Sequence, residues 1–169
     1  QAEHGMDSQS ILFTDNEDVA RAVLAEVERQ LEALPRKEMA SSSLGHSRIV
    51  VLHDMEEAFE ICNQYAPEHL ILAMDTALDW ADRVVNAGSV FLGHYSCESA
   101  GDYASGTNHT LPTSGYAKAY SGVNLDSFCR KITFQHLTRE GIESIGRAVE
   151  VMAEAESLDA HRNAMTLRM

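Results

Sequence analysis

Residues 66–72, Ala-Pro-Glu-His-Leu-Ile-Leu, join a helix-like segment to a strand-like segment, and the same alternation of helix and strand continues on both sides of them. Pro67 disfavours helical backbone at the residue before it, so a helix containing Met55 and Phe59 should end here. The run from His69 to Ala73 is typical of a strand. The turn sets the carboxylate of Glu68 beside the imidazole of His69, a pair suited to acid–base chemistry near neutral pH. On these residues alone, a solvated turn is the simpler alternative.

Short apolar runs alternate with amphipathic segments around this turn. Strands are predicted over residues 10–14, 48–52, 69–73 and 89–92, with helix-like segments between them. This alternation is typical of βαβ units, so we expect an α/β fold: a partial Rossmann-like domain with a mostly parallel sheet and flanking helices. Ligands of such sheets gather at the carboxyl ends of the strands, which makes the Gly-rich segment 93–122 a candidate functional loop.

The remaining boundaries follow from capping patterns. Thr14 or Asp15 is expected to cap a helix that Pro35 stops, and a second short helix over 37–44 is expected to end at Gly45. Asp54, with Glu57 three residues later, is expected to start the helix that contains Met55 and Phe59. After residue 124 we expect a short strand at 132–135 and two helices. The predicted domains are residues 1–123, the second half of a Rossmann-like domain carrying the active site, and residues 124–169, a mainly helical segment that dimerises and completes the site.

The composition excludes several classes of partner. The 169 residues carry a net charge of −13, which disfavours binding to nucleic acid or to an anionic membrane. No apolar run approaches the ~18 residues of a membrane span, and no signal peptide is visible. The three cysteines lie far apart, so we expect core or near-core thiols without a nucleophile, in the reducing cytoplasm. The chain begins at Gln1 without a methionine, and we expect it to be a fragment of a longer protein.

Several further side chains could bind a metal or a small ligand. Asp102 and His109 lie in the Gly-rich segment. Both side chains could bind zinc or contact an amine, and a turn-forming aspartate with a surface histidine is an equally good interpretation. When each pair is considered alone, solvated or packed side chains are the simpler explanation for Gln1 with His4 and for Glu156 with His161. A bend near Ser157 would be needed to bring Glu156 and His161 together. Four other histidines show no convergent acidic partner: His46, His53, His94 and His136.

Taken together, motifs spread over the whole chain resemble histidinol dehydrogenase. Each motif is only moderately specific, but all of them occur in register and in the right order. They are Gln-Ala-Glu-His-Gly at 1–5, Ala-Pro-Glu-His-Leu at 66–70, Asn-Ala-Gly-Ser-Val-Phe-Leu-Gly at 86–93, Gly-Asp-Tyr-Ala-Ser-Gly-Thr-Asn-His-Thr-Leu-Pro-Thr at 101–113, and Glu-Ser-Leu-Asp-Ala-His at 156–161.

The resemblance implies a zinc- and NAD-dependent oxidation of L-histidinol to L-histidine through the aldehyde, in the last steps of histidine biosynthesis. It implies that His69 is the base, that Glu68 activates the hydrating water, and that a homodimer donates His161 across its interface. The implied zinc ligands are Gln1, His4, Asp102 and His161. The implied substrate contacts are Gln1, His4, His69, Asp102, His109, Glu156 and His161.

Two alternatives to this enzyme remain at this point. One is a non-catalytic module that dimerises or binds a metal or small ligand, and the other is a zinc hydrolase with Glu68 as its base. The chain contains no GxGxxG or P-loop motif, so the residues that contact NAD are expected upstream of it. This chain is expected to correspond to the C-terminal portion of the enzyme.

Overall fold

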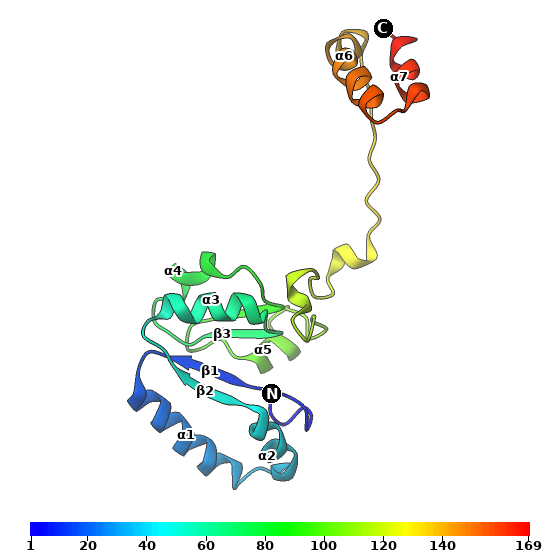
Figure 1. The fold of residues 1–169 in the computed structure, drawn as a ribbon. Helices are drawn as coiled ribbons and strands as arrows, with labels where there is room; N and C mark the ends of the chain where they lie inside the picture. Colours follow the sequence, from blue (N-terminus) through cyan, green and yellow to red (C-terminus); the bar gives the residue numbers. More distant parts are fainter. The chain divides into compact units, whose positions relative to one another are not determined.

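Two pairs of parallel strands organise the first part of the chain in the computed structural model, which describes residues 1–169 (Figure 1). β1 (Ile11–Thr14) pairs with β2 (Arg48–Val51), and β3 (His69–Leu72) pairs with β4 (Ser89–Leu92). The predicted α/β alternation and parallel pairing are therefore present. The single larger sheet is not, because the hydrogen-bonded ladders join the strands only in pairs. Apolar periodicity marks strands, but pairing between strands is a long-range property.

The helices lie between the strands in the order of βαβ units. α1 (Glu17–Leu31) and α2 (Lys37–His46) connect β1 to β2, and α3 (Met55–Tyr65) connects β2 to β3. The short α4 (Ala77–Trp80) and the 3-10 turn η1 (Ala81–Arg83) lead into β4. α1 packs against both strands of the first pair, and α3 also contacts β1. None of the helices is long and apolar enough to cross a membrane.

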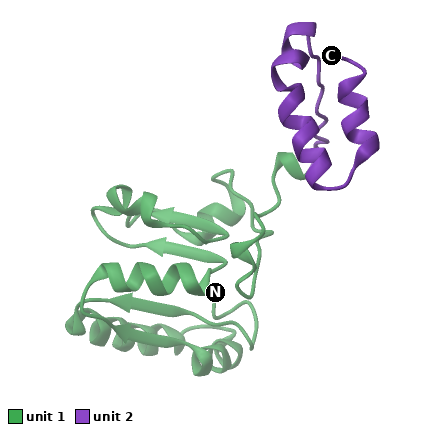
Figure 2. Cartoon of the chain, turned by 45° about the horizontal axis from the view of Figure 1, so that its top comes forward, with its two compact units in different colours: residues 1–127 green, residues 128–169 purple.

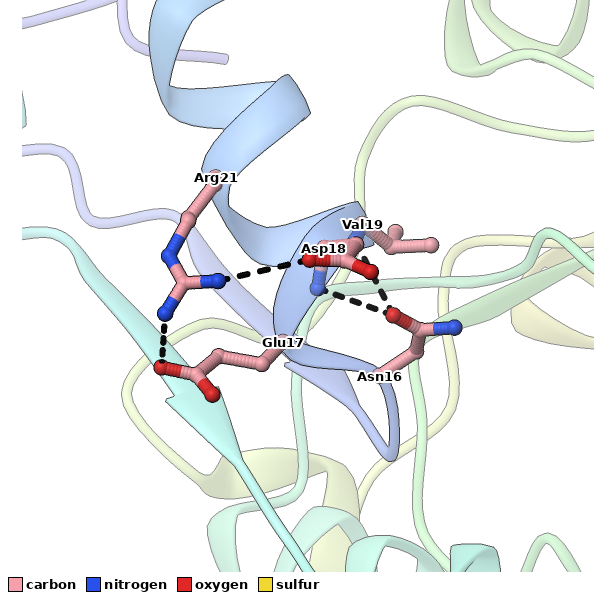
Figure 3. A network of polar contacts seen from close by, with 5 residues as sticks. All are labelled: Asn16, Glu17, Asp18, Val19 and Arg21. Carbon is pink, nitrogen blue, oxygen red and sulfur yellow. Dashed lines mark hydrogen bonds and ion pairs between the residues drawn. The ribbon is translucent and has the colours of Figure 1, made fainter.

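The N-terminus of α1 is capped by Asn16, not by the predicted Thr14 or Asp15 (Figure 3). Its side-chain oxygen accepts hydrogen bonds from the backbone N–H groups of Asp18 (2.9 Å) and Val19 (3.2 Å). Asn is as good a cap as Asp, and the chain enters the helix one residue later than expected. Arg21 then reaches back to the carboxylates of Glu17 and Asp18, which supports the first turns.

The ends of α2 and α3 differ in how well the sequence predicted them. α3 begins as expected, with the Asp54 carboxylate accepting from the Glu57 N–H at 2.9 Å. It ends at Ala66, which adopts left-handed backbone (φ 56°) directly before Pro67. The predicted end of α2 at Gly45 is wrong. The helix continues to His46, and the backbone of Gly45 does not adopt the left-handed conformation of a C-terminal cap.

The core of the first part lies between α3, α4 and one face of the β3–β4 pair. Phe59, Leu70, Leu72 and Ala77 form its buried centre. Trp80 stacks on Phe59 with ring centroids 4.9 Å apart. Leu70 and Leu72 alternate along β3 with His69 and Ile71, so the histidine belongs to the opposite face of the strand. Burial of the leucine face therefore fixes which side of the sheet receives His69.

The segment after β4 contains more regular structure than predicted. It includes the helix α5 (Glu98–Tyr103) and the 3-10 turns η2 (Tyr116–Lys118) and η3 (Leu125–Phe128). Asp102 consequently lies in the last turn of a helix and not in a Gly-rich loop, whereas His109 does lie in a loop. Gly101 allows this helix to approach β4 closely, because a Cβ at this position would lie 2.6 Å from Cε1 of Phe91.

The chain divides into two compact units, residues 1–127 and residues 128–169 (Figure 2). In the second unit, α6 (Arg139–Ala155) packs against α7 (Asp159–Thr166), and Ser157 makes the bend between them with positive φ (59°). The predicted strand at 132–135 is wrong: these residues are in irregular backbone, with the side chains of Ile132 and Phe134 exposed. An isolated apolar run without a pairing strand gains no ladder hydrogen bonds.

Candidate active site

The turn that carries Glu68 is held against the start of β4 by backbone hydrogen bonds. The Gly88 N–H donates to the Pro67 carbonyl and the Ser89 N–H donates to the Glu68 carbonyl, both at 2.9 Å. A Cβ on Gly88 would lie only 2.5 Å from the Glu68 carbonyl oxygen, so only glycine allows this approach. The backbone beneath the Glu68–His69 pair is therefore fixed on both sides.

A side-chain clamp from α3 holds the segment that precedes Gly88. The Asn63 side-chain oxygen accepts from the Val85 N–H (2.7 Å) and the Asn86 N–H (3.2 Å), and its amide donates to the Arg83 carbonyl (2.9 Å). The Asn86 amide donates in return to the Asn63 carbonyl (2.9 Å). The clamp connects the body of α3 to the loop that supports the turn.

His69 is nearly buried and has one nitrogen without a partner. Its side chain is 10% exposed, and Nε2 makes no hydrogen bond. The nearest charged group is Asp102, whose Oδ1 lies 4.0 Å from Nε2, too far for a direct hydrogen bond. The ring lies over Phe91, with centroids 6.0 Å apart and planes at 27°. Because a buried polar atom without a hydrogen bond destabilises the folded state, the unpartnered Nε2 indicates a position where a ligand or water binds.

Gly101 brings Asp102 close to His69. A Cβ on Gly101 would lie 2.6 Å from Cε1 of Phe91 and 2.8 Å from Oγ1 of Thr107. Without a side chain at this position, α5 packs directly on the Phe91 ring of β4. The following residue, Asp102, then faces the imidazole that lies on the same ring.

Three donor groups converge beside His69. A nitrogen of His4 and carboxylate oxygens of Glu98 and Asp102 all lie within 4.8 Å of one another. Two donors on one tetrahedral zinc lie roughly 3.4 Å apart for bonds of about 2.1 Å, so small side-chain rotations would let all three reach one ion. The donor types and their number fit Zn²⁺. His4 and Asp102 were predicted as metal ligands from the sequence, and the structure brings them together.

Glu98 was missed in the sequence. It precedes Asp102 by four residues, and both lie on α5. Residues four apart on a helix share a face, which is the signal that would have identified it. The signal was hidden because the segment was expected to be a loop, where a spacing of four has no such meaning.

The other predicted site residues are placed less directly. Gln1 lies in the same turn as His4, whose N–H donates to the Gln1 carbonyl at 3.1 Å. His109 is exposed in the loop after α5. Glu156 ends α6 and His161 lies on α7, so both belong to the second unit, and their part in the site stays a prediction.

The site lies away from the carboxyl ends of the strands, contrary to expectation. His69 is the first residue of β3, at its amino end. The chain passes the carboxyl end of β4 and then returns along the sheet as α5, which carries Asp102 back to the start of β3. In open parallel sheets, ligands bind in the loops that follow the carboxyl ends of the strands. Here α5 brings Asp102 back toward the start of β3, so the site side chains meet near the amino end of that strand.

Two expectations for other side chains were also wrong. His94 does have an acidic neighbour, since its Nε2 lies 3.3 Å from Oδ1 of Asp75, although both side chains are exposed. Cys97 and Cys129 are exposed, not near the core. Only Cys62 is partly buried, and burial raises the pKa of its thiol, which disfavours the reactive thiolate.

Comparison with known proteins agrees with the motif pattern. The family model described as "Histidinol dehydrogenase" matches residues 1–169. The chain is 60% identical to the histidinol dehydrogenase of Bacteroides thetaiotaomicron over 169 residues, which is 100% of this chain and 40% of the relative. It is 56% identical over 170 residues to the chloroplastic histidinol dehydrogenase of Oryza sativa subsp. japonica, covering 100% of this chain and 36% of that protein.

A solved structure gives the same result for the fold. The crystal structure of histidinol dehydrogenase from Elizabethkingia anophelis is 57% identical, with a TM-score of 0.91 over 99% of this chain and 39% of that one. The chain thus spans about 40% of the length of its curated relatives. With a family model that matches from the first residue to the last, the chain belongs to the histidinol dehydrogenase family.

Proposed function

We propose that this chain works as part of a longer enzyme that oxidises L-histidinol to L-histidine through the aldehyde, using zinc and NAD. One observation carries the proposal: the unpartnered, nearly buried Nε2 of His69 lies 4.0 Å from Asp102, beside a cluster of cation donors. A base next to a site for a positively charged anchor is what alcohol oxidation requires. When bound, Zn²⁺ would hold the substrate's imidazole and amine, and NAD would accept the hydride.

In this proposal His69 takes the hydroxyl proton of histidinol as the carbon loses its hydride, which gives the aldehyde. Glu68 then takes a proton from the water that adds to the aldehyde carbonyl. His69 acts a second time on the resulting hydrate, whose second hydride loss gives the carboxylic acid. Gln1, His4 and Asp102, together with His161 from the second subunit of a homodimer, would hold zinc. His109 and Glu156 would contact the substrate.

NAD itself has no recognisable site in these residues. The chain contains no Gly-rich dinucleotide motif, so we assign NAD binding to the remaining length of the family protein.

The proposal is tested by NADH formation in the longer protein that contains this chain. His69→Asn is expected to lower the rate with L-histidinol by about 10²–10⁴-fold, the usual contribution of a general base. Glu68→Gln is expected to slow the second oxidation more than the first, so that aldehyde accumulates and fewer NADH form per histidinol. Normal rates in both variants would refute these roles.

A second measurement separates the enzyme from its alternatives. The 169-residue chain is titrated with Zn²⁺ and with L-histidinol while its melting temperature is followed. Zinc and histidinol binding without NADH formation by the longer protein would favour the non-catalytic binding module. Ester or amide hydrolysis that Glu68→Gln abolishes would favour the hydrolase.

A further inference from the structure

Glu98 occupies a position in the site to which the sequence motifs give no role. It lies in the first turn of α5, and Asp102 follows one turn later on the same helix. Its carboxylate is half-buried and lies within 4.8 Å of donor atoms of both Asp102 and His4. The short helix therefore contributes two neighbouring carboxylates, and an imidazole from the N-terminal turn lies close to both of them.

The charge of this arrangement is unbalanced. Two carboxylates at such a separation repel each other unless a cation lies between them. Neither Glu98 nor Asp102 forms an ion pair with a lysine or arginine, and the nearest basic partner of Asp102 is His69 at 4.0 Å. The protein thus leaves the positive charge to be supplied by something that binds.

A second, independent observation points to a ligand at the same place. His69 is about nine-tenths buried, and its Nε2 is directed toward Asp102 without a hydrogen-bond partner. A buried imidazole nitrogen that has no partner and faces the carboxylate cluster indicates that a group binds within this cluster. The cluster and the unpartnered nitrogen together define one site.

We propose that Glu98 is a further cation-binding residue of this site, acting together with His4 and Asp102. The inference rests on the proposed function, because it concerns the same site. The ligand is a small cation held by carboxylate oxygens, and two sources have this chemistry: a divalent metal ion and the ammonium group of an amino alcohol. In either case Glu98 contributes a negative charge that Gln cannot replace.

The test compares Glu98→Gln with two other variants of the 169-residue chain. Asp102→Asn removes a predicted ligand of the same site, and Glu60→Gln removes the same charge from the exposed surface of α3. Zn²⁺ affinity is measured by competition with a chelator, without any activity assay. Glu98→Gln is expected to weaken Zn²⁺ binding by at least ~10-fold if the cation is the metal, and Glu60→Gln is expected to leave it unchanged.

A second arm tests the ammonium source with Zn²⁺ present. L-Histidinol is compared with 4-(hydroxymethyl)imidazole, which lacks the amine. Unchanged Zn²⁺ affinity in Glu98→Gln, with a loss of at least ~10-fold for histidinol only, would support the inference with the ammonium as ligand.

The outcomes separate this inference from the proposed function. If Asp102→Asn loses zinc while Glu98→Gln matches the original chain for zinc and for both ligands, the inference alone is overturned. If the original chain binds neither zinc nor histidinol, the inference is overturned, whereas the proposed function is overturned only if the longer protein also forms no NADH from L-histidinol.

Discussion

Replacing Gly101 by alanine tests how closely α5 must approach β4. The added methyl group would lie 2.6 Å from Cε1 of Phe91, 3.0 Å from its Cζ, and 2.8 Å from Oγ1 of Thr107. Phe91 is 7% exposed and belongs to a paired strand, so its ring has little room to move. The methyl group should therefore push α5 away from the sheet and carry Asp102 away from His69.

The magnitude follows from two opposing effects. Overpacking a core position costs about 1–3 kcal/mol. Alanine is favoured over glycine inside a helix by about 0.5–1 kcal/mol, which offsets part of that cost. The expected net loss of unfolding free energy is about 1–2 kcal/mol.

Gly45 provides the matched control. It also lies in a helix, but a Cβ built there meets no atom within 4 Å. Gly45→Ala should consequently stabilise the chain by up to about 1 kcal/mol, so the same substitution is expected to have opposite signs at the two positions.

Urea unfolding followed by tryptophan fluorescence measures both variants. Trp80 is the only tryptophan, and it stacks on Phe59 in the core of the first unit. Gly101→Ala should also lower Zn²⁺ affinity, whereas Gly45→Ala should not. A Gly101→Ala chain that is as stable as the original and binds zinc equally well would refute the close-packing argument.

Three further measurements test other parts of the structure. Asn63→Ala removes the clamp on the loop before Gly88, and should lower the unfolding free energy by about 1–3 kcal/mol in the same urea assay; an unchanged midpoint would show that the clamp contributes nothing. Iodoacetamide should alkylate the exposed Cys97 well before Cys62, whose pKa is raised by burial, and mass spectrometry of digests gives the order. Hydrogen bonds from Arg29, and then from Gln30, lower the pKa of Glu26 to about 2. Because the folded-state pKa is depressed, the stabilisation is complete above the ordinary value of 4.5 and is lost as the pH falls through about 2. An NMR titration of Glu26 with a midpoint near 4.5 would contradict this ion pair.

The parts of the fold that depend on neighbouring residues could be predicted from the sequence. The Asp54 cap of α3 and its end before Pro67 were read correctly, because capping and proline sterics act within a few residues. The four strands were found for a similar reason, since each is a short apolar run. The cap of α1 was misplaced because Thr14, Asp15 and Asn16 are all capable of capping, and the observed cap is Asn16, whose backbone is extended (φ −127°, ψ 115°).

The sequence motifs by themselves determined the family and the candidate pair Glu68–His69. What only the tertiary structure decided is how distant residues meet. The return of α5 along the sheet, allowed by Gly101 against Phe91, brings Asp102 to His69 and places Glu98 in the same cluster with His4. Such contacts depend on packing between segments separated by tens of residues, and the absence of a side chain at one glycine decides them more than any local propensity does.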